Sequence, residues 1–283
     1  MSYPSPPASG QVPPGQVQPG HGPAGQVPSG HAPSGHAPSG HGATFHPAGD
    51  PSSDPIAPIR QAPGDRPFVV AQLGQSLDGR IATLSGESRW INKDAALDHV
   101  HRVRAAVDAV IVGVGTVVAD DPLLNVRRVE GLHPVRVVID PTGRIPAGAR
   151  CLEGRDGIRR IVVCATGADA PKGLPSDVEI LRVARMGKAL QPAAIVAALW
   201  AAGLKRFLIE GGAHTVSGFL DAGAVDRLHV MVAPVILGSG KPGLTLTPID
   251  RLAQALRPKA SIHVLADGDV LFDCDMRHQM KGS

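Results

Sequence analysis

Residues that could hold a ligand are concentrated in one stretch, DAVIVGVGTVVADDPLLNVR, at positions 108–127. It opens with an apolar, largely β-branched run, Ala109 to Val112, which is typical of a strand buried on both faces. Gly113 and Gly115 follow, and a backbone without Cβ atoms can approach a ligand closely. A hydroxyl, two carboxylates and a guanidinium come next, on Thr116, Asp120, Asp121 and Arg127. Ligands of open α/β sheets bind beyond the carboxyl ends of strands, so the stretch predicts a site, with a buried strand and polar turn as the alternative.

A second candidate lies at Glu210-Gly211-Gly212, where a predicted strand feeds a helix over residues 213–222. Free N–H groups and the helix dipole at such a junction favour an anion. Thr215 and Ser217 would add hydroxyl donors. A plain turn is the alternative, because a bare Gly-Gly pair is a weak signal.

Several catalytic classes lack their signatures. GVGTVV at 113–118 is not a dinucleotide-binding fingerprint, because valine stands at the third glycine position. HExxH, CxxC, the paired HxE and PCxxC, and GxSxG are all missing, so we predict no metal and no serine nucleophile. The three cysteines, at positions 151, 164 and 274, are far apart and indicate buried thiols in a reducing compartment.

The composition divides the chain near Arg66. Residues 1–66 hold 15 of the 27 prolines and no leucine, which leaves too little apolar surface to offset the entropy of ordering. We therefore predict a disordered tail over 1–65, a folded domain over 66–278 and a short C-terminal tail over 279–283. Periodic histidines in the first tail could bind a transition metal weakly, although a flexible solvated tail is the simpler interpretation.

Charge and hydropathy exclude two kinds of partner. The formal net charge of +3 is too small to indicate nucleic acid. The longest apolar stretch, Ala193 to Leu204, is too short to span a bilayer, and no basic and apolar leader begins the chain. We expect a soluble cytoplasmic protein.

The order of elements predicts an α/β fold. Buried strands are expected at 68–73, 109–112, 135–139, 161–164, 178–181 and 207–212, and helices at 94–107, 191–202 and 213–222. Three further strands, 228–236, 262–265 and 270–274, have no long helix between them, so we expect a mixed, mainly parallel sheet with an antiparallel edge. In the first helix, which Asn92 can cap, His99 and His101 face different directions, and surface or capping roles are expected for both.

Taken together, several stretches resemble one family: SLDGRIA (76–82), SGESRWI (85–91), HRVRA (101–105), VGVGTVVADDPLLNVR (112–127), VRVVID (135–140), IEGGAH (209–214) and APVILGSG (233–240). They are similar to the reductase domain of the bifunctional riboflavin-biosynthesis deaminase/reductase. The resemblance implies a dihydrofolate-reductase-like three-layer fold, a homodimer and NADPH as cofactor. It implies reduction of the ribosyl group of 5-amino-6-(5-phosphoribosylamino)uracil to a ribityl group. The deaminase signature is missing, which implies a stand-alone reductase and a separate deaminase.

The resemblance also implies roles for individual residues. The expected cofactor contacts are Gly74, Trp90, Thr116, Asp120, Gly212, Ala213, His214, Thr215, Val216, Ser217 and Gly218. The expected substrate contacts are Ser88, Arg104, Leu124, Arg127 and Glu210. Two guanidiniums suit a phosphate group. Glu210 or Asp120 could assist proton transfer as catalytic groups, with hydrogen bonding to ribose hydroxyls as the alternative, favoured for Asp120.

Two other functions stay open at this point. A reductase of the same fold could act on a pterin such as dihydrofolate or dihydromethanopterin, although a pair of arginines favours a phosphorylated substrate. A non-catalytic binding module is the third possibility. NADPH rather than NADH follows only from the resemblance, because Pro141 cannot donate a hydrogen bond to a 2′-phosphate.

Overall fold

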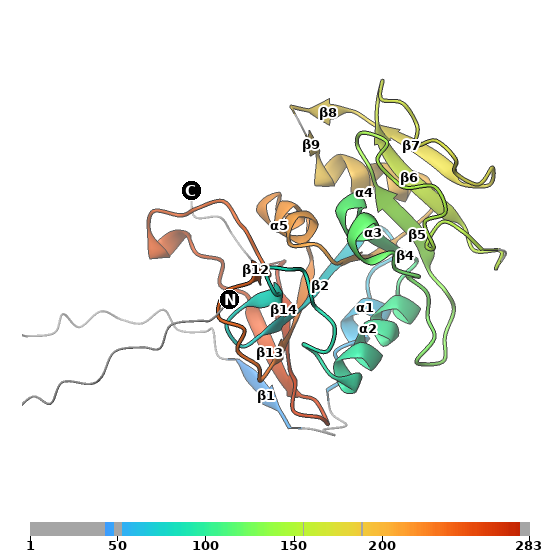
Figure 1. The fold of residues 1–283 in the computed structure, drawn as a ribbon. Helices are drawn as coiled ribbons and strands as arrows, with labels where there is room; N and C mark the ends of the chain where they lie inside the picture. The colour runs from blue at the N-terminus through green and yellow to red at the C-terminus, as the bar shows by residue number, and fades with distance from the viewer. Residues whose placement is uncertain (1–42, 48–52, 155, 188, 278–283) are drawn as a thin grey trace, which may run out of the picture. The chain divides into compact units, whose positions relative to one another are not determined.

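A ten-stranded mixed sheet is the centre of the computed structural model, which describes residues 43–47, 53–154, 156–187 and 189–277 (Figure 1). The strand order is β1-β13-β14-β11-β2-β10-β4-β5-β6-β7. The strands are β1 (Thr44–His46), β2 (Phe68–Ser76), β4 (Ala109–Gly113), β5 (Val135–Ile139), β6 (Arg160–Ala165), β7 (Glu179–Val183), β10 (Arg206–Glu210), β11 (Arg227–Ala233), β13 (Lys259–Val264) and β14 (Val270–Asp275). Two small sheets pair β3 (Arg80–Ala82) with β12 (Lys241–Pro242) and β8 (Arg185–Met186) with β9 (Ala189–Leu190).

The mixed sheet confirms the predicted fold class. Strands from β11 through β2, β10, β4, β5 and β6 to β7 pair in parallel, whereas β14 runs antiparallel to both β11 and β13. The parallel strands are apolar on both faces because helices cover both faces. In β4, Ala109 and Ile111 pack into one core and Val110 and Val112 into the other.

Five α-helices and one 3₁₀ turn complete the described part of the fold: α1 (Ala57–Arg60), α2 (Asp94–Ala106), α3 (Val114–Asp120), α4 (Pro192–Ala201), α5 (Ala213–Asp221) and the 3₁₀ turn Leu252–Gln254. Apolar residues of α4 and α5 pack into one core, and those of α1, α3 and the end of α2 into the other. The sequence predicts a short helical turn from Thr116 to Ala119; α3 starts two residues earlier and ends one residue later. No helix within the described residues is both long and apolar enough to cross a membrane.

The ordered fold starts before Arg66, which corrects the expected boundary of the tail. Ile56 and Ile59, on and just before α1, have no exposed surface and pack beside α2 and β2. β1 pairs in parallel with β13 at the edge of the sheet. The proline-rich composition hid these short elements, because two isoleucines in a polar segment give no periodic pattern. Residues 1–42, 48–52 and 278–283, which include most of the predicted tails, lie outside the described residues.

A row of polar side chains crosses the sheet beneath α2. Glu210 of β10 pairs with Gln72 of β2, Gln72 with His229 of β11, and His229 with Asp273 of β14. Paired residues on neighbouring strands project to the same face. The helix contacts this row near both ends, because its His99 reaches His229 and its Arg104 reaches Glu210.

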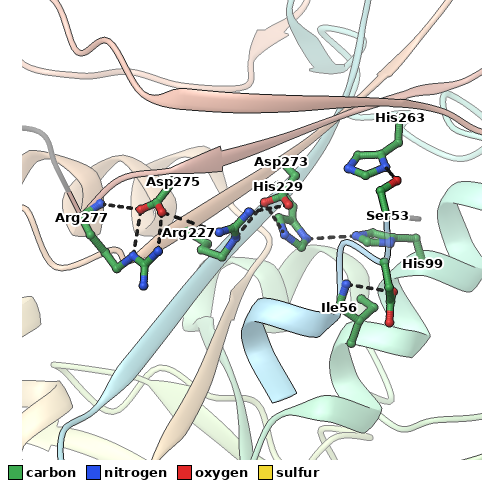
Figure 2. A network of polar contacts seen from close by, with 10 residues as sticks. Ser53, Ile56, His99, Arg227, His229, His263, Asp273, Asp275 and Arg277 are labelled. Carbon is green, nitrogen blue, oxygen red and sulfur yellow. Dashed lines mark hydrogen bonds and ion pairs between the residues drawn. The ribbon is translucent and has the colours of Figure 1, made fainter. Parts of the chain in front are cut away.

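Figure 2 shows the end of this row that lies in the antiparallel part of the sheet. His99 Nε2 lies 3.0 Å from His229 Nδ1, and His229 Nε2 lies 3.1 Å from Asp273 Oδ1. Arg227 Nε donates to the same oxygen at 2.8 Å. Burial by itself would raise the pKa of Asp273, but His229 and Arg227 outweigh it and hold that pKa at about 2. Burial lowers the pKa of His99, so this ring joins the network in its neutral form. The expected surface role of His99 is therefore wrong.

Two glycine junctions interlock at the ends of the neighbouring strands β4 and β10. A Cβ on Gly113 would lie 2.4 Å from Thr215 Oγ1, and a Cβ on Gly212 would lie 2.9 Å from Thr116 Oγ1. Each threonine therefore occupies the space that the other junction's glycine leaves open. Gly212 also has a φ of +75°, which favours glycine. The N-terminal turns of α3 and α5 are therefore closely packed against each other through these two threonines.

We predict that Asp273→Asn lowers the free energy of unfolding by about 3 kcal/mol or more, because buried Arg227 then loses its bidentate carboxylate partner and keeps only the longer 3.8 Å contact with Asp275. Urea unfolding at neutral pH measures the loss. Asp98→Asn is the matched control, since Asp98 is 46% exposed in its ion pair with Arg128 and such pairs contribute at most about 1 kcal/mol. Equal losses in the two variants would contradict the structural role of the buried network.

We also predict that Gly113→Ala lowers the free energy of unfolding by about 1–3 kcal/mol through overpacking against Thr215. Gly115→Ala is the control, because no atom lies within 4 Å of the added Cβ. The double variant Gly113→Ala with Thr215→Ala should recover most of the loss, since the nearest remaining atom is 3.7 Å away. A double-mutant cycle by thermal or urea unfolding tests this, and simple additivity of the two losses would rule out the interlock.

Candidate functional site

The predicted site lies where three adjacent parallel strands end. β10 pairs with β2 on one side and with β4 on the other. Glu210 ends β10, Gly113 ends β4, and α3 and α5 start directly after these two strand ends. The two stretches that the sequence marked as candidates, about a hundred residues apart in the chain, are therefore neighbours at one edge of the sheet.

Arg104 and Glu210 form the main ion pair of this edge. Arg104 Nε donates to Glu210 Oε2 at 2.7 Å, and Arg104 Nη2 donates to the other carboxylate oxygen. The remaining nitrogen, Nη1, donates to the carbonyl of Asn125 at 2.9 Å. The two side chains are only 8% and 15% exposed. Every nitrogen of this guanidinium is thus bonded within the protein.

The expected role of Arg104 as a substrate ligand stays a prediction. Three of the five N–H donors of its guanidinium bond to Glu210 and to the carbonyl of Asn125, and one N–H on each of Nη1 and Nη2 is left. Within the protein, Arg104 holds Glu210 and the loop of Asn125 in place. Glu210 accepts through both oxygens, so its negative charge is compensated and its position fixed.

Arg127 remains available for a ligand. Its side chain is exposed, and Nη1 donates to Asn125 Oδ1 at 2.9 Å. Arg104 and Arg127 both donate to Asn125, which places the two guanidiniums beside one residue. Partial burial and the charge of Arg104 lower the pKa of Arg127. The sequence-based expectation that Arg104, Arg127 and Glu210 meet near the glycine junctions therefore agrees with the structure.

Two histidines that the sequence analysis did not assign to the site hold the loop that carries Arg127. The backbone N–H of Arg127 donates to His101 Nδ1 at 3.1 Å, and that of Val126 donates to His133 Nδ1 at 3.2 Å. His101 is buried, with 3% exposure, so its expected surface role is wrong. Burial, followed by the charges of Arg104 and Arg127, lowers the pKa of His101 to about 4.

The position of His101 follows from the packing of α2, which is covered on two sides. The sheet lies against one side, and the loop 124–127 lies against another. His101 and Arg104 are three residues apart and therefore share the side that faces this loop. That i, i+3 spacing in HRVR was the signal that could have identified His101, because it places the histidine beside an arginine already assigned to the site.

The other predicted contact residues differ in their exposure to solvent. Leu124 is buried in the core with φ of +54°, so only its backbone can face a ligand. Val216 and Ser217 are also buried, and Ser217 Oγ accepts from the Thr245 N–H at 2.8 Å. Ser88, Trp90, Asp120, His214 and Gly218 are exposed, and Thr116, Ala213 and Thr215 are half-buried. Trp90 is 81% exposed.

Packing against Asn92 explains why position 74 is a glycine. A Cβ there would lie 2.1 Å from Asn92 Oδ1, so the glycine makes room for this side chain. Asn92 does not cap α2, whose N-cap is Lys93; it donates instead to Asp269 Oδ2 at 3.1 Å. Contact of Gly74 with a cofactor therefore stays a prediction.

Asp78, in the turn after β2, also shapes this edge. Its carboxylate accepts from Ser76 Oγ at 2.7 Å and from the N–H groups of Leu237 and Gly238 at 3.1 and 2.7 Å. These hydrogen bonds, that of Ser76 first, lower the pKa of Asp78 to about 2. The SLDG turn is thereby joined to the loop that follows β11. Across the described ranges, no group of three His, Cys, Asp or Glu side chains is arranged to bind a metal ion.

Comparison with known proteins gives a consistent result. Residues 67–265 match the RibD C-terminal domain family. The chain is 36% identical over 203 residues to the 2,5-diamino-6-ribosylamino-4(3H)-pyrimidinone 5′-phosphate reductase of Methanothermobacter thermautotrophicus, covering 68% of this chain and 90% of that protein. It is 33% identical over 177 residues to the riboflavin biosynthesis protein RibD of Aquifex aeolicus, covering 62% of this chain and 49% of the relative.

A solved structure shares the fold. The diaminohydroxyphosphoribosylaminopyrimidine deaminase/5-amino-6-(5-phosphoribosylamino)uracil reductase of Thermotoga maritima superposes with a TM-score of 0.61 at 30% identity, covering 74% of this chain and 56% of that one. The chain thus spans about half the length of the RibD relatives that it matches. The match covers the sequence from β2 to β13, with both glycine junctions, and ends before β14; the chain belongs to the RibD C-terminal domain family.

Proposed function

We propose that this protein is an NADPH-dependent reductase of riboflavin biosynthesis that converts 5-amino-6-(5-phosphoribosylamino)uracil to its ribitylamino product. The observation that carries the proposal is the juxtaposition of Arg127, the Arg104–Glu210 pair and the glycine junctions at three adjacent strand ends. Family membership supports the same reaction class. The proposed reaction involves two anionic groups, the substrate phosphate and the cofactor pyrophosphate. In this proposal Arg127 binds the first, the Gly212 junction binds the second, and Glu210 is the carboxylate beside them.

Each residue has a part in this proposal. Arg127 binds the substrate phosphate, because its guanidinium is exposed and partly oriented by Asn125. Glu210 accepts hydrogen bonds from the substrate. When the C1′–O4′ bond of the ribosylamine breaks, O4′ takes a proton from solvent and C1′ becomes part of an iminium ion, whose positive charge Glu210 stabilises until hydride reaches C1′. Both of its oxygens are bonded to Arg104, so it is a poor proton donor and an oriented anion. Asp120, exposed at the end of α3, suits ribose hydroxyls.

The cofactor would lie over the interlocked junctions, and it supplies the hydride for C1′ when bound. Gly212 has a positive φ, and the first N–H groups of α5 have no partner within the helix, which suits a pyrophosphate. Exposed Trp90 has a free face for a ring. The preference for NADPH over NADH, a homodimeric state and a cytoplasmic location remain predictions from the family resemblance.

A second candidate substrate comes from the archaeal relatives. They are named for reduction of 2,5-diamino-6-ribosylamino-4(3H)-pyrimidinone 5′-phosphate, and one of them is covered over 90% of its length. The two substrates share the phosphoribosylamino group and differ in the ring. The proposed Arg127 and Glu210 contacts serve either one. Dihydrofolate, which has no ribose phosphate, would leave Arg127 without a phosphate to bind.

The decisive assay follows oxidation of NADPH by the purified protein with the two phosphoribosylaminopyrimidines and with dihydrofolate. We expect turnover of at least one phosphorylated pyrimidine and little with dihydrofolate. Substituting NADH under the same conditions tests the cofactor preference. Turnover of dihydrofolate alone would replace the proposal by the pterin alternative.

We predict that Arg127→Ala raises KM for the phosphorylated substrate by roughly 10- to 100-fold, the effect of losing a charge-assisted hydrogen bond, and leaves KM for NADPH nearly unchanged. Arg128→Ala is the matched control, because this neighbouring arginine bonds to Asp94 and Asp98 on α2. Equal effects of Arg127→Ala on both KM values, or an equal effect of the control, would contradict the phosphate assignment.

A further inference from the structure

Building on the proposed function, we infer that His101 and His133 are positioning residues for substrate binding: their ring nitrogens hold the backbone of the loop that presents Arg127 to the substrate phosphate. Neither side chain has to touch the substrate. They act by accepting hydrogen bonds from two successive backbone N–H groups, those of Arg127 and Val126.

The loop is fixed at three consecutive residues. Arg104 donates to the carbonyl of Asn125, His133 accepts from the N–H of Val126, and His101 accepts from the N–H of Arg127. These three side chains come from α2 and from the segment just before β5, so the loop is held from two directions. The loop belongs to no strand or helix, so its backbone groups lack the regular hydrogen bonds of secondary structure. The three side chains supply hydrogen bonds in their place.

The loop needs such support because its backbone is strained. Leu124 has a φ of +54°, which is unfavourable for a leucine, and its side chain is anchored in the core. Released from its bonds, the loop would relax toward ordinary backbone angles. Arg127, three residues further on, would then sample many positions, and binding a phosphate would require the loop to be ordered again.

The chemistry of His101 matches this role. The ring must be neutral for Nδ1 to accept a hydrogen bond. Burial and two neighbouring guanidiniums keep it so, as the lowered pKa of about 4 indicates. Arg104 therefore has two effects on the loop: it bonds to Asn125 directly and helps to keep His101 an acceptor.

The test compares two replacements of His101. Phenylalanine keeps the bulk of the ring and removes the acceptor, whereas asparagine offers an oxygen close to the position of Nδ1. We expect His101→Phe to raise KM for the phosphorylated substrate roughly three- to tenfold, the range for one neutral hydrogen bond, with KM for NADPH unchanged. We expect His101→Asn to lie between His101→Phe and the natural protein. His133→Phe should raise KM for the phosphorylated substrate in the same way, and His133→Asn should raise it less. These two variants provide a second test if His101→Phe does not fold.

Hydrogen exchange by NMR reads the bond itself, independently of activity. In His101→Phe the amide of Arg127 should exchange roughly three- to tenfold faster. The buried amide of Ile145, which donates to Asp140, is the internal reference for global unfolding. Unchanged exchange at Arg127, or equal acceleration at Ile145, would overturn the inference.

The kinetic arms separate this inference from the proposed function. If Arg127→Ala raises KM and His101→Phe accelerates exchange without changing KM, the positioning role is overturned and the proposed function stands. If Arg127→Ala leaves KM unchanged, the phosphate assignment fails, and the inference that rests on it fails as well.

Discussion

The bidentate pair of Arg104 and Glu210 is the interaction on which the rest of the site depends. Transferring two charges from water to a nearly buried position is costly, and the cost is offset only when geometry and additional hydrogen bonds are good. Here both carboxylate oxygens and all three guanidinium nitrogens are bonded. The pair joins the helix α2, the end of β10 and the loop of Asn125, so three segments far apart in sequence have one common reference point.

The polar row beneath α2 extends this constraint across the sheet. Most of the sheet is apolar, and apolar side chains alone specify helix position loosely, since neighbouring registers bury similar area. The contacts of His99 with His229 and of Arg104 with Glu210 allow one placement of α2. A shift by one residue in β11 or β10 would turn these polar groups to the opposite, apolar face. The polar row therefore fixes the placement of the elements, while the apolar cores supply most of the driving force.

The sequence was sufficient for the sheet and for the prediction that the two candidate stretches meet at one edge of it. Buried parallel strands are continuous apolar runs, so β5 was predicted at its observed bounds, β4 within one residue and β10 within two. The rule that ligands lie at the carboxyl ends of strands then brought Gly113 and Glu210 to one edge. The sequence could not show which partner Arg104 takes, because a guanidinium suits a phosphate and a carboxylate equally. The sequence analysis also expected His101 at the surface, which is wrong. Helical periodicity identifies the side of α2 that packs on the sheet, but it does not show that a loop covers another side. The threonine–glycine interlock depends on distances that only the folded chain defines.

The short elements ahead of β2 have a consequence for how this protein can be shortened. A chain cut at the compositional boundary near Arg66 would lose Ile56 and Ile59, both fully buried, and would leave a gap in the core that they share with α2 and β2. It would also lose β1, which pairs with β13 at the outer edge of the sheet. An uncovered strand edge is a template for pairing with other chains. Such a truncation would therefore favour self-association, and the useful cut lies upstream of Thr44.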